Sequence, residues 1–361
     1  MCNITNTQDI ESFLTHFGDK KKANFLKPAL MNLSNKMTQE WFVARGLPLI
    51  IREDGKVFPK TLKAQSVVDT LVSSAIKNKI QISYSQVVHN IEHNNAIFTV
   101  FTESGSFTTE NLVVTTGGKS YEVTGSDGSG YSLARSLGHA VVEPTQALVG
   151  VMIKDHHLSG LSGNAIRDSF VEIFRKGESK RYLQTKGDLL FTHKGVSGPV
   201  ILSNSRFIHN GDLLKVSLLP TTNKESAREN LLSILTSTPK KQLGTVLKRS
   251  GLFGKLIDAL CAELEISPEI TCGNIPKRQR KALITLLLEY PLEVSRKGYF
   301  SSAMITAGGI DLSEVNRKTM ESKKVPQLYF AGEILDIDGD TGGYNLQAAF
   351  STAKLIADTL S

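Results

Sequence analysis

Two neighbouring glycines, Gly342 and Gly343, stand directly before a segment with helical periodicity, and this arrangement suits ligand binding. Glycine lets another molecule approach the backbone closely because it has no side chain. The first turn of a helix has N–H groups without helical acceptors and lies at the positive end of the helix dipole. The segment can therefore hold a phosphate, a carbonyl oxygen or an anionic ring. A plain tight turn would use the same glycines.

The flanking elements read as strand, loop and helix. Residues 329–331 are an apolar run that suits a buried strand, and Gly332 and Glu333 follow it. The loop after them carries three aspartates, Asp336, Asp338 and Asp340. Spacings of four and three then predict that one apolar helix face contains Leu346, Phe350, Ala353, Ala357 and Leu360.

His193 is the best candidate for a general acid or base by residue type, because the unperturbed pKa of histidine lies near neutrality. It stands between a strand-like run and Gly195, so its ring could instead fix a turn by hydrogen bonds. The pair His156–His157 has no Cys or carboxylate nearby at ligand spacing. We therefore predict no metal site.

Composition indicates an ordinary soluble globular protein of two or three domains. The chain has 361 residues, of which 40% are hydrophobic. The longest apolar run, 282–288, is far shorter than the ~20 residues that cross a bilayer. Three scattered cysteines form no disulfide framework, so a cytoplasmic location is expected, with no membrane partner.

The formal charge of +7 permits a nucleic-acid partner, but the sequence does not favour one. Lysine and arginine are spread in short groups, and no aromatic-rich RNA-binding signature accompanies them. An anionic cofactor or substrate would use the same charge.

Local patterns divide the chain into an α/β part and an insertion. Residues 1–145 and 301–361 mix helices with strands, 146–222 are rich in strands, and 223–300 are helical. Short strands are expected at 81–84 and 200–202, within longer runs of extended segments.

Five motifs in order along the chain resemble those of the HI0933-like flavoproteins. They are CNITN at 2–6, TTGGKSY at 115–121, LLFTHKGVSGP at 189–199, TAGGIDL at 306–312 and AGEILDIDGDTGGYNLQ at 331–347. The last is long enough to be highly specific. The resemblance implies an FAD-binding domain of the two-dinucleotide, Rossmann-like type, with an inserted β-barrel-like subdomain and a small helical one.

The resemblance also implies residue roles. Glu333 is expected beside the ribityl chain of FAD, and the helix start after Gly342 at the pyrimidine end of the ring. Val88 is expected to contact the adenine through its backbone. The full set of cofactor-binding residues implied is Cys2, Asn3, Thr5, Asn6, Val88, Thr116, Gly117, Gly118, Gly332, Glu333, Gly342, Gly343, Tyr344, Asn345, Leu346 and Gln347.

The beginning of the chain departs from the family pattern. No strand and no G-x-G-x-x-G turn precede Cys2, although a dinucleotide-binding fold normally opens with them. We expect that a strand–helix–strand unit of roughly 40–50 residues is absent. Either the start was misassigned or the protein is shortened and has lost FAD.

The resulting hypothesis is an FAD-dependent oxidoreductase that transfers a hydride through flavin N5 to or from a small organic substrate. NAD(P)H is a candidate electron donor. The ligand should lie where the two parts of the chain meet, since pockets often form between domains. Two alternatives stay open: a flavin-free remnant that acts as a binding module, and an FAD-dependent protein that acts on RNA.

Overall fold

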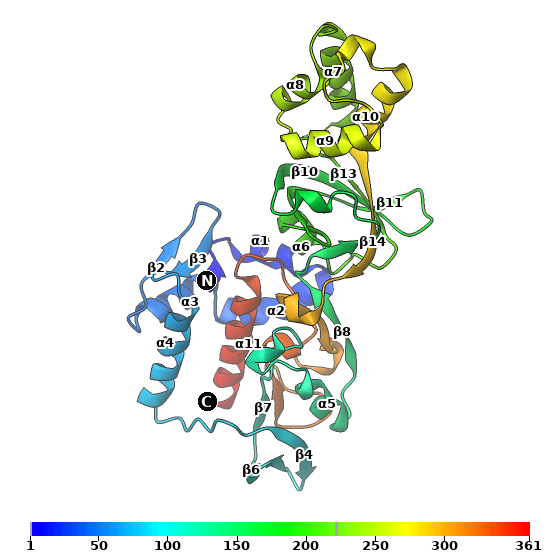
Figure 1. Ribbon diagram of the computed structural model, residues 1–361. Coiled ribbons are helices and arrows are strands. Elements are labelled where there is room, and N and C mark those ends of the chain that lie inside the picture. Colours follow the sequence, from blue (N-terminus) through cyan, green and yellow to red (C-terminus); the bar gives the residue numbers. More distant parts are fainter. Residues whose placement is uncertain (1, 221–222) are drawn as a thin grey trace. The chain divides into compact units, whose positions relative to one another are not determined.

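The computed structural model describes residues 2–220 and 223–361 (Figure 1). The described chain separates into two compact units. Unit 1 comprises 1–147 and 300–361, and unit 2 comprises 148–299. Unit 1 contains every motif of the C-terminal segment, so it holds the candidate site.

Unit 1 is a mixed α/β assembly. Its helices are α1 (Ile10–Leu14), α2 (Lys20–Asn32), α3 (Asn35–Val43), α4 (Ala64–Lys77), α5 (Ser129–Ser136) and α11 (Tyr344–Leu360). Its strands are β1 (Thr5–Asn6), β2 (Leu49–Ile51), β3 (Lys56–Pro59), β4 (Val88–Asn94), β5 (Ile97–Thr102), β6 (Gly105–Thr109), β7 (Leu112–Val114), β8 (Val141–Ala147), β15 (Ile305–Ile310) and β16 (Leu328–Phe330).

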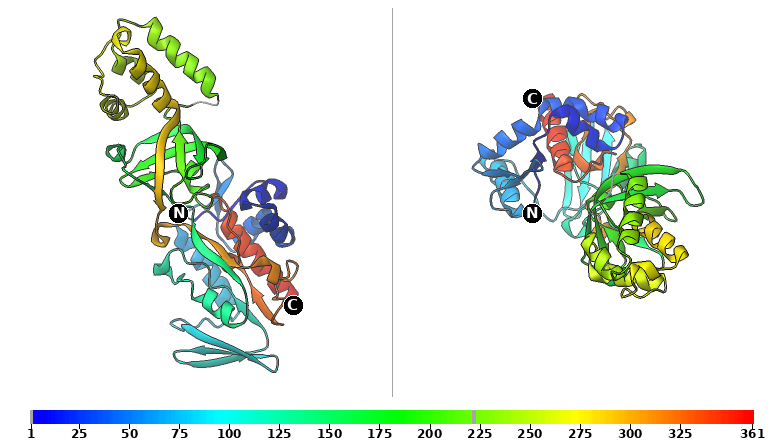
Figure 2. Two further views of the ribbon diagram at one scale, coloured as in Figure 1. Left: turned by 90° about the vertical axis from the view of Figure 1, so that its right-hand side faces the viewer. Right: turned by 90° about the horizontal axis from the view of Figure 1, so that it is seen from above.

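Segments from opposite ends of the chain form the centre of unit 1. Strands β7 and β16 pair in parallel, with Val114 opposite Phe330. Parallel strands require a crossover connection, which is the hallmark of Rossmann-like sheets. Helix α11 packs against α2 and α3 from the other end of the chain (Figures 1 and 2). The α/β, Rossmann-like class predicted from the sequence is confirmed.

Unit 2 is built on a closed barrel with strand order β10-β11-β12-β9-β14-β13. Its strands are β9 (Val151–Ile153), β10 (Ala165–Phe174), β11 (Arg181–Thr192), β12 (Gly195–Ser197), β13 (Leu213–Val216) and β14 (Tyr290–Lys297). Its helices are α6 (Pro199–Leu202), α7 (Lys224–Ser237), α8 (Leu243–Arg249), α9 (Gly254–Glu263) and α10 (Lys277–Glu289). One hydrophobic cluster contains both barrel and helix residues, among them Leu214 and Leu287.

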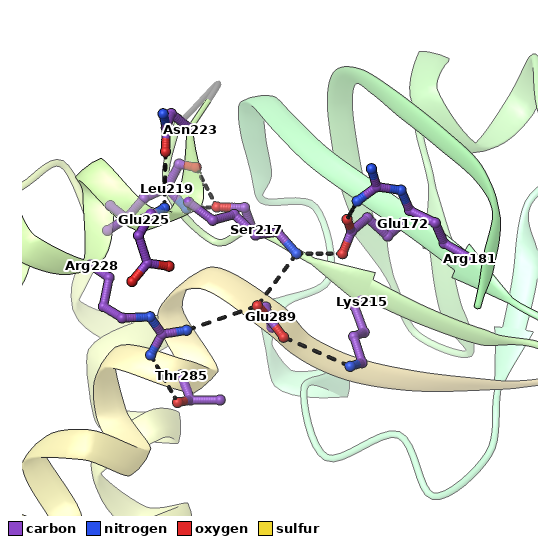
Figure 3. A network of polar contacts seen from close by, with 11 residues as sticks. Glu172, Arg181, Lys215, Ser217, Leu219, Asn223, Glu225, Arg228, Thr285 and Glu289 are labelled. Carbon is purple, nitrogen blue, oxygen red and sulfur yellow. Dashed lines mark hydrogen bonds and ion pairs between the residues drawn. The ribbon is translucent and has the colours of Figure 1, made fainter. Parts of the chain in front are cut away.

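An ion-pair network that includes the buried Glu172 joins the barrel to these helices (Figure 3). Glu172 on β10 is 6% exposed and pairs with Arg181 at 2.6 Å and with Lys224. Glu289 pairs with Lys215 at 3.7 Å and with Lys224 at 3.6 Å. Burial raises the pKa of Glu172, but the two cations outweigh burial, and the net shift is downward.

Two predicted strands are wrong. Residues 200–202 form helix α6, because Gly198 with φ 92° and Pro199 begin a helical turn there. Residues 81–84 form no strand, since no neighbouring segment pairs with them in the described chain. The meander of β4, β5 and β6 that follows does form as expected.

The predicted apolar face of α11 is also wrong, although the helix itself is present. Leu346 and Leu360 are 37% and 43% exposed. The residues buried on α11 are Tyr344, Gln347, Ala348, Ser351, Thr352 and Ile356. Three of these are polar, and they include residues with partners far away in the sequence: Ser351 Oγ, for example, donates to the carbonyl of Leu33 at 2.7 Å. Satisfied polar groups can be buried at little cost, so periodicity of apolar residues misplaces the face.

Candidate functional site

The start of α11 packs tightly on strand β1. Gly343 caps the helix with φ 92°, and Gly342 has φ 139°, both in the region that favours glycine. A Cβ on Gly343 would lie 2.5 Å from the carbonyl carbon of Thr5. No side chain of the described chain caps this helix. Contact of its first-turn N–H groups with a ligand stays a prediction.

Next to this helix start lies a cavity of about 190 Å³. Four of the predicted cofactor-binding residues line it: Gly332, Glu333, Asn345 and Leu346. Gly332 and Glu333 belong to the short 3₁₀ turn Gly332–Ile334 that follows β16. The Gly332 N–H donates to Thr352 Oγ1 at 3.1 Å, which fixes this turn against α11.

Glu333 is held in place by strand β15. Its Oε1 accepts a hydrogen bond from the Thr306 backbone N–H at 2.7 Å. Burial raises the pKa of the Glu333 carboxyl group, and the charge of Asp338 adds to this, against the hydrogen bonds from Thr306. The folded chain therefore holds the proton of this carboxyl group more tightly than an exposed glutamate would.

The segment from Thr116 to Gly118 reaches the same place. A Cβ on Gly118 would lie 2.7 Å from Glu333 Oε1 and would collide with Thr306 Oγ1. The Lys119 N–H donates to Thr306 Oγ1 at 2.7 Å. Gly130 in α5 leaves no room for a Cβ beside Thr116. Close packing thus requires glycine at 118, beside Glu333, and at 130, beside Thr116 and Ile334.

Contacts from Lys22 and His16 fix the aspartate-rich loop before the helix. Lys22 Nζ lies 2.7 Å from Asp336 Oδ1 and 2.6 Å from Asp338 Oδ1. His16 Nδ1 lies 2.9 Å from Asp340 Oδ2. Burial lowers the pKa of Lys22, but the two aspartates raise it more. Asn345 braces the loop as well, since its Oδ1 accepts from the Gly339 N–H at 2.7 Å.

Three polar side-chain atoms near the β1–α11 contact are buried without a hydrogen-bond partner in the described chain. They are Asn3 Oδ1, Thr5 Oγ1 and Gln347 Oε1. An unsatisfied buried polar atom costs about 1–3 kcal/mol, so such atoms call for an explanation. A bound polar ligand or ordered water at this position would supply the missing partners.

Several residues predicted to bind the cofactor do not line this cavity and instead contact other parts of the chain. The Tyr344 ring stacks on His16, with ring centroids 4.0 Å apart, and its hydroxyl donates to Gln8 Oε1 at 3.1 Å. Asn6 is buried and its carbonyl accepts from Asn35 Nδ2. The half-buried Cys2 packs against the small core around Phe42.

The remaining predictions fall elsewhere. Val88 starts β4 opposite Thr102 and packs at the edge of the main core of unit 1. Its contact with adenine stays a prediction. His193 is exposed in the turn between β11 and β12 of unit 2, and nothing in its surroundings tests a catalytic role.

Thr306 and Lys22 are site residues that sequence reasoning missed. Thr306 lies in the TAGGIDL motif, which was a signal for it. Lys22 gave no signal, because its partners Asp336 and Asp338 lie 314 and 316 residues further along the sequence.

The chain is similar to known proteins over nearly its whole length. The family model described as "HI0933-like protein Rossmann domain" matches residues 1–359. A ribosomal RNA dihydrouridine synthase of Haemophilus influenzae is 30% identical over 100% of this chain and 87% of the relative. Its counterpart in Escherichia coli is 28% identical over 99% of this chain and 86% of the relative.

A 3-dehydro-bile acid delta(4,6)-reductase of Clostridium scindens is 28% identical over 98% of this chain and 86% of the relative. Among the described residues, no helix is both long enough and apolar enough to cross a membrane.

The family prediction made from the motifs is confirmed. Because the family model spans nearly the whole chain, this protein belongs to the HI0933-like family of FAD-dependent oxidoreductases.

Proposed function

We propose that this chain binds FAD and transfers a hydride between flavin N5 and an organic substrate. One observation carries the proposal. The start of α11 and Glu333 line one cavity, and Gly118 of the TTGG segment packs against the Glu333 carboxyl group. Buried polar atoms without hydrogen-bond partners lie nearby on β1 and α11. This set suits a ligand with a polyhydroxyl chain and a polar ring, which is the flavin half of FAD.

Each part has a specific role in this proposal. Glu333 would accept hydrogen bonds from the ribityl hydroxyls, with the Thr306 N–H fixing one of its oxygens. The N–H groups that follow Gly343 would contact the pyrimidine end of the ring. A helix N-terminus stabilises negative charge nearby, so it would favour uptake of electrons by the ring. Asn3 and Thr5 would complete the polar contacts through their unsatisfied oxygens.

We further infer the reduction of a carbon–carbon double bond as the reaction class. A delta(4,6)-reductase saturates such bonds, and dihydrouridine is uridine whose ring double bond has been saturated. FAD held beside Glu333 and Gly343 would supply hydride chemistry, with the hydride going to one carbon of the double bond and a proton from an acid to the other. The two electrons must come from a reduced donor, for which NAD(P)H remains our proposal.

A small organic molecule is the first candidate substrate, and RNA is the second. Similarity to the bile acid reductase supports the first. Two relatives named as ribosomal RNA dihydrouridine synthases support the second, as does the formal charge of +7. Both substrates offer a double bond conjugated to a carbonyl group, so the same site chemistry serves either.

The test is a single-turnover experiment under anaerobic conditions. The FAD-loaded chain is reduced with dithionite, freed of excess reductant, and mixed with either a 3-oxo-4,6-diene steroid acid or a uridine-containing ribosomal RNA fragment. Reoxidation of the flavin with one saturated product per flavin supports the proposal and identifies the substrate. A flavin that binds but reduces neither compound would contradict the proposed reaction class.

A further inference from the structure

A second cavity in unit 1, of about 400 Å³, adjoins the Glu333 cluster. Two cationic, two acidic and two aromatic side chains line it: Lys119, Arg135, Asp127, Glu143, Tyr131 and Phe300. All of them belong to the loop before α5, to α5 itself, to β8 and to the start of the segment after unit 2. The roles proposed above for the flavin site use none of these side chains.

The charged side chains that line this cavity differ in whether they have a partner of opposite charge. Asp127 Oδ1 accepts from the Ser129 N–H at 2.8 Å, and this hydrogen bond lowers the pKa of Asp127. Glu143 lies 3.6 Å from Arg135, and both side chains are largely exposed. In the described part of the chain, Lys119 has no carboxylate partner, and its Nζ lies 5.3 Å from the centroid of the Phe300 ring. Lys119 therefore has a charge that no carboxylate of the described chain neutralises.

The backbone of Lys119 is anchored to the flavin-side cluster. Its N–H donates to Thr306 Oγ1 at 2.7 Å, and the Thr306 N–H donates to Glu333 Oε1 at 2.7 Å. Tyr131, whose ring is buried, reaches the Glu333 carbonyl at 3.5 Å through its hydroxyl. Glu333 lines the first cavity and Lys119 lines the second. Two hydrogen bonds through Thr306 therefore link a residue of one cavity to a residue of the other.

We propose that this second cavity binds the anionic group, a phosphate or a carboxylate, of the substrate whose double bond is reduced. Lys119 provides the charge, and the Phe300 ring provides a flat apolar surface beside it. The proposal rests on the proposed function, because it assigns the cavity to the substrate of that reaction. The proposed role gives a purpose to a lysine that lacks an acidic partner and whose backbone N–H is hydrogen-bonded to Thr306.

Binding of four probes tests the proposal without turnover. Isothermal titration calorimetry would compare uridine 5′-monophosphate, uridine, cholate and inorganic phosphate on the FAD-loaded parent chain, on Lys119→Met and on Lys119→Arg. A charged hydrogen bond lost from a site weakens binding roughly ten- to hundredfold. With Lys119→Met we expect that loss for the anionic probe that the parent chain binds, whereas uridine should bind as it does to the parent. Lys119→Arg should recover much of the affinity for the anionic probe.

Lys248→Met is the matched control, because Lys248 is an exposed lysine on α8 of unit 2. It should bind every probe as the parent does. A loss confined to the monophosphate assigns a phosphate-bearing substrate, and a loss confined to cholate assigns a carboxylate. A parent chain that binds neither anion, or a Lys119→Met chain that binds both as the parent does, overturns the proposal.

A flavin titration on the same samples separates the two proposals. If the parent and Lys119→Met chains both bind FAD but anion binding does not depend on Lys119, only the cavity assignment fails. If the well-folded parent chain binds no FAD, the proposed function fails. Circular dichroism and a thermal transition for each variant establish that a loss of binding is not a loss of folding.

Discussion

At the scale of single residues, Glu333 shows how the site prepares a carboxyl group for a polar ligand. Its surroundings remove water, which disfavours the charged form, while Thr306 fixes one oxygen. The result is a half-buried acid whose proton is held more tightly in the folded chain than in the unfolded one. That difference must appear as a dependence of stability on pH.

Glu333→Gln tests this directly. As pH rises above 4.5, the ordinary pKa of glutamate, Glu333 loses its proton in the unfolded parent before it does so in the folded parent. The parent therefore loses stability through that window, whereas the glutamine variant does not. We expect the free energy of unfolding of Glu333→Gln, relative to the parent, to increase with pH. Urea unfolding across pH 4 to about 8 measures it.

The exposed Glu40 on α3 supplies the control for that series. Glu40→Gln should show no such trend relative to the parent. A flat difference for Glu333→Gln as well would mean that the pKa of Glu333 is not raised in the folded chain.

Lys22 gives a second prediction at this scale. It is 16% exposed and forms ion pairs with Asp336 and Asp338, the latter 2% exposed. Removing one member of a buried ion pair costs roughly 3–5 kcal/mol because a buried charge loses its partner. Lys22→Met should destabilise the chain by about that amount in urea unfolding, whereas the exposed Lys27→Met on the same helix should change it by less than about 0.5 kcal/mol. Equal effects would show that the loop does not depend on this pair.

At the scale of elements, the contact of β1 with the start of α11 decides whether the helix N-terminus is available. Gly343→Ala would place a Cβ 2.5 Å from the backbone of Thr5. It would also impose φ 92° on alanine, which by itself costs about 1–2 kcal/mol. We expect a larger loss of stability than that, together with at least a tenfold weaker affinity for FAD, measured by quenching of flavin fluorescence.

Gly46→Ala separates backbone strain from packing. Gly46 has φ 81°, but a Cβ there would meet nothing within 4 Å. This variant should lose only about 1 kcal/mol of stability and should bind FAD as the parent does. If Gly343→Ala behaved in the same way, the packing of β1 on α11 would not matter for the cofactor.

The elements also show what the sequence could predict. The periodicity after Gly343 predicted a helix, and α11 runs from Tyr344 to Leu360. The motif residues Gly332, Glu333, Asn345 and Leu346 do line one cavity, although their contact with FAD stays a prediction. Motif spacing succeeds here because these residues lie close together in the sequence.

Long-range contacts explain what the sequence could not predict. The buried side of α11 includes Gln347, whose Nε2 donates to the Leu33 carbonyl at 3.0 Å and to Thr38 Oγ1 at 2.8 Å. Neither partner is visible from the composition of the helix. The ion pairs of Lys22 have the same origin. The helix at 200–202 was missed for a local reason: its β-branched residues suggested a strand, but Pro199 began a helix.

At the scale of the molecule, two units with separate hydrophobic cores divide the work. The core of unit 2 contains the barrel and its helices, and the largest core of unit 1 contains the elements around β7, β16 and α11. Every described residue that lines the two cavities belongs to unit 1. Stability of unit 2 and affinity for FAD should therefore respond to different substitutions.

Leu214→Ala tests this division. Leu214 is fully buried in β13, and truncating such a side chain costs roughly 2–5 kcal/mol. We expect calorimetry to show a lower transition temperature while the affinity for FAD stays within about twofold of the parent. A loss of affinity as large as that of Gly343→Ala would show that the site depends on the packing of the barrel.

The central claim is that the residues around Gly343 and Glu333 bind FAD, and a titration of the purified chain with FAD tests it most directly. Flavin absorbance and fluorescence would be followed for the parent, Gly343→Ala and Gly46→Ala. We predict saturable binding of one FAD per chain, weakened at least tenfold in Gly343→Ala and unchanged in Gly46→Ala. A folded parent chain that leaves the spectrum of free FAD unaltered would contradict the account.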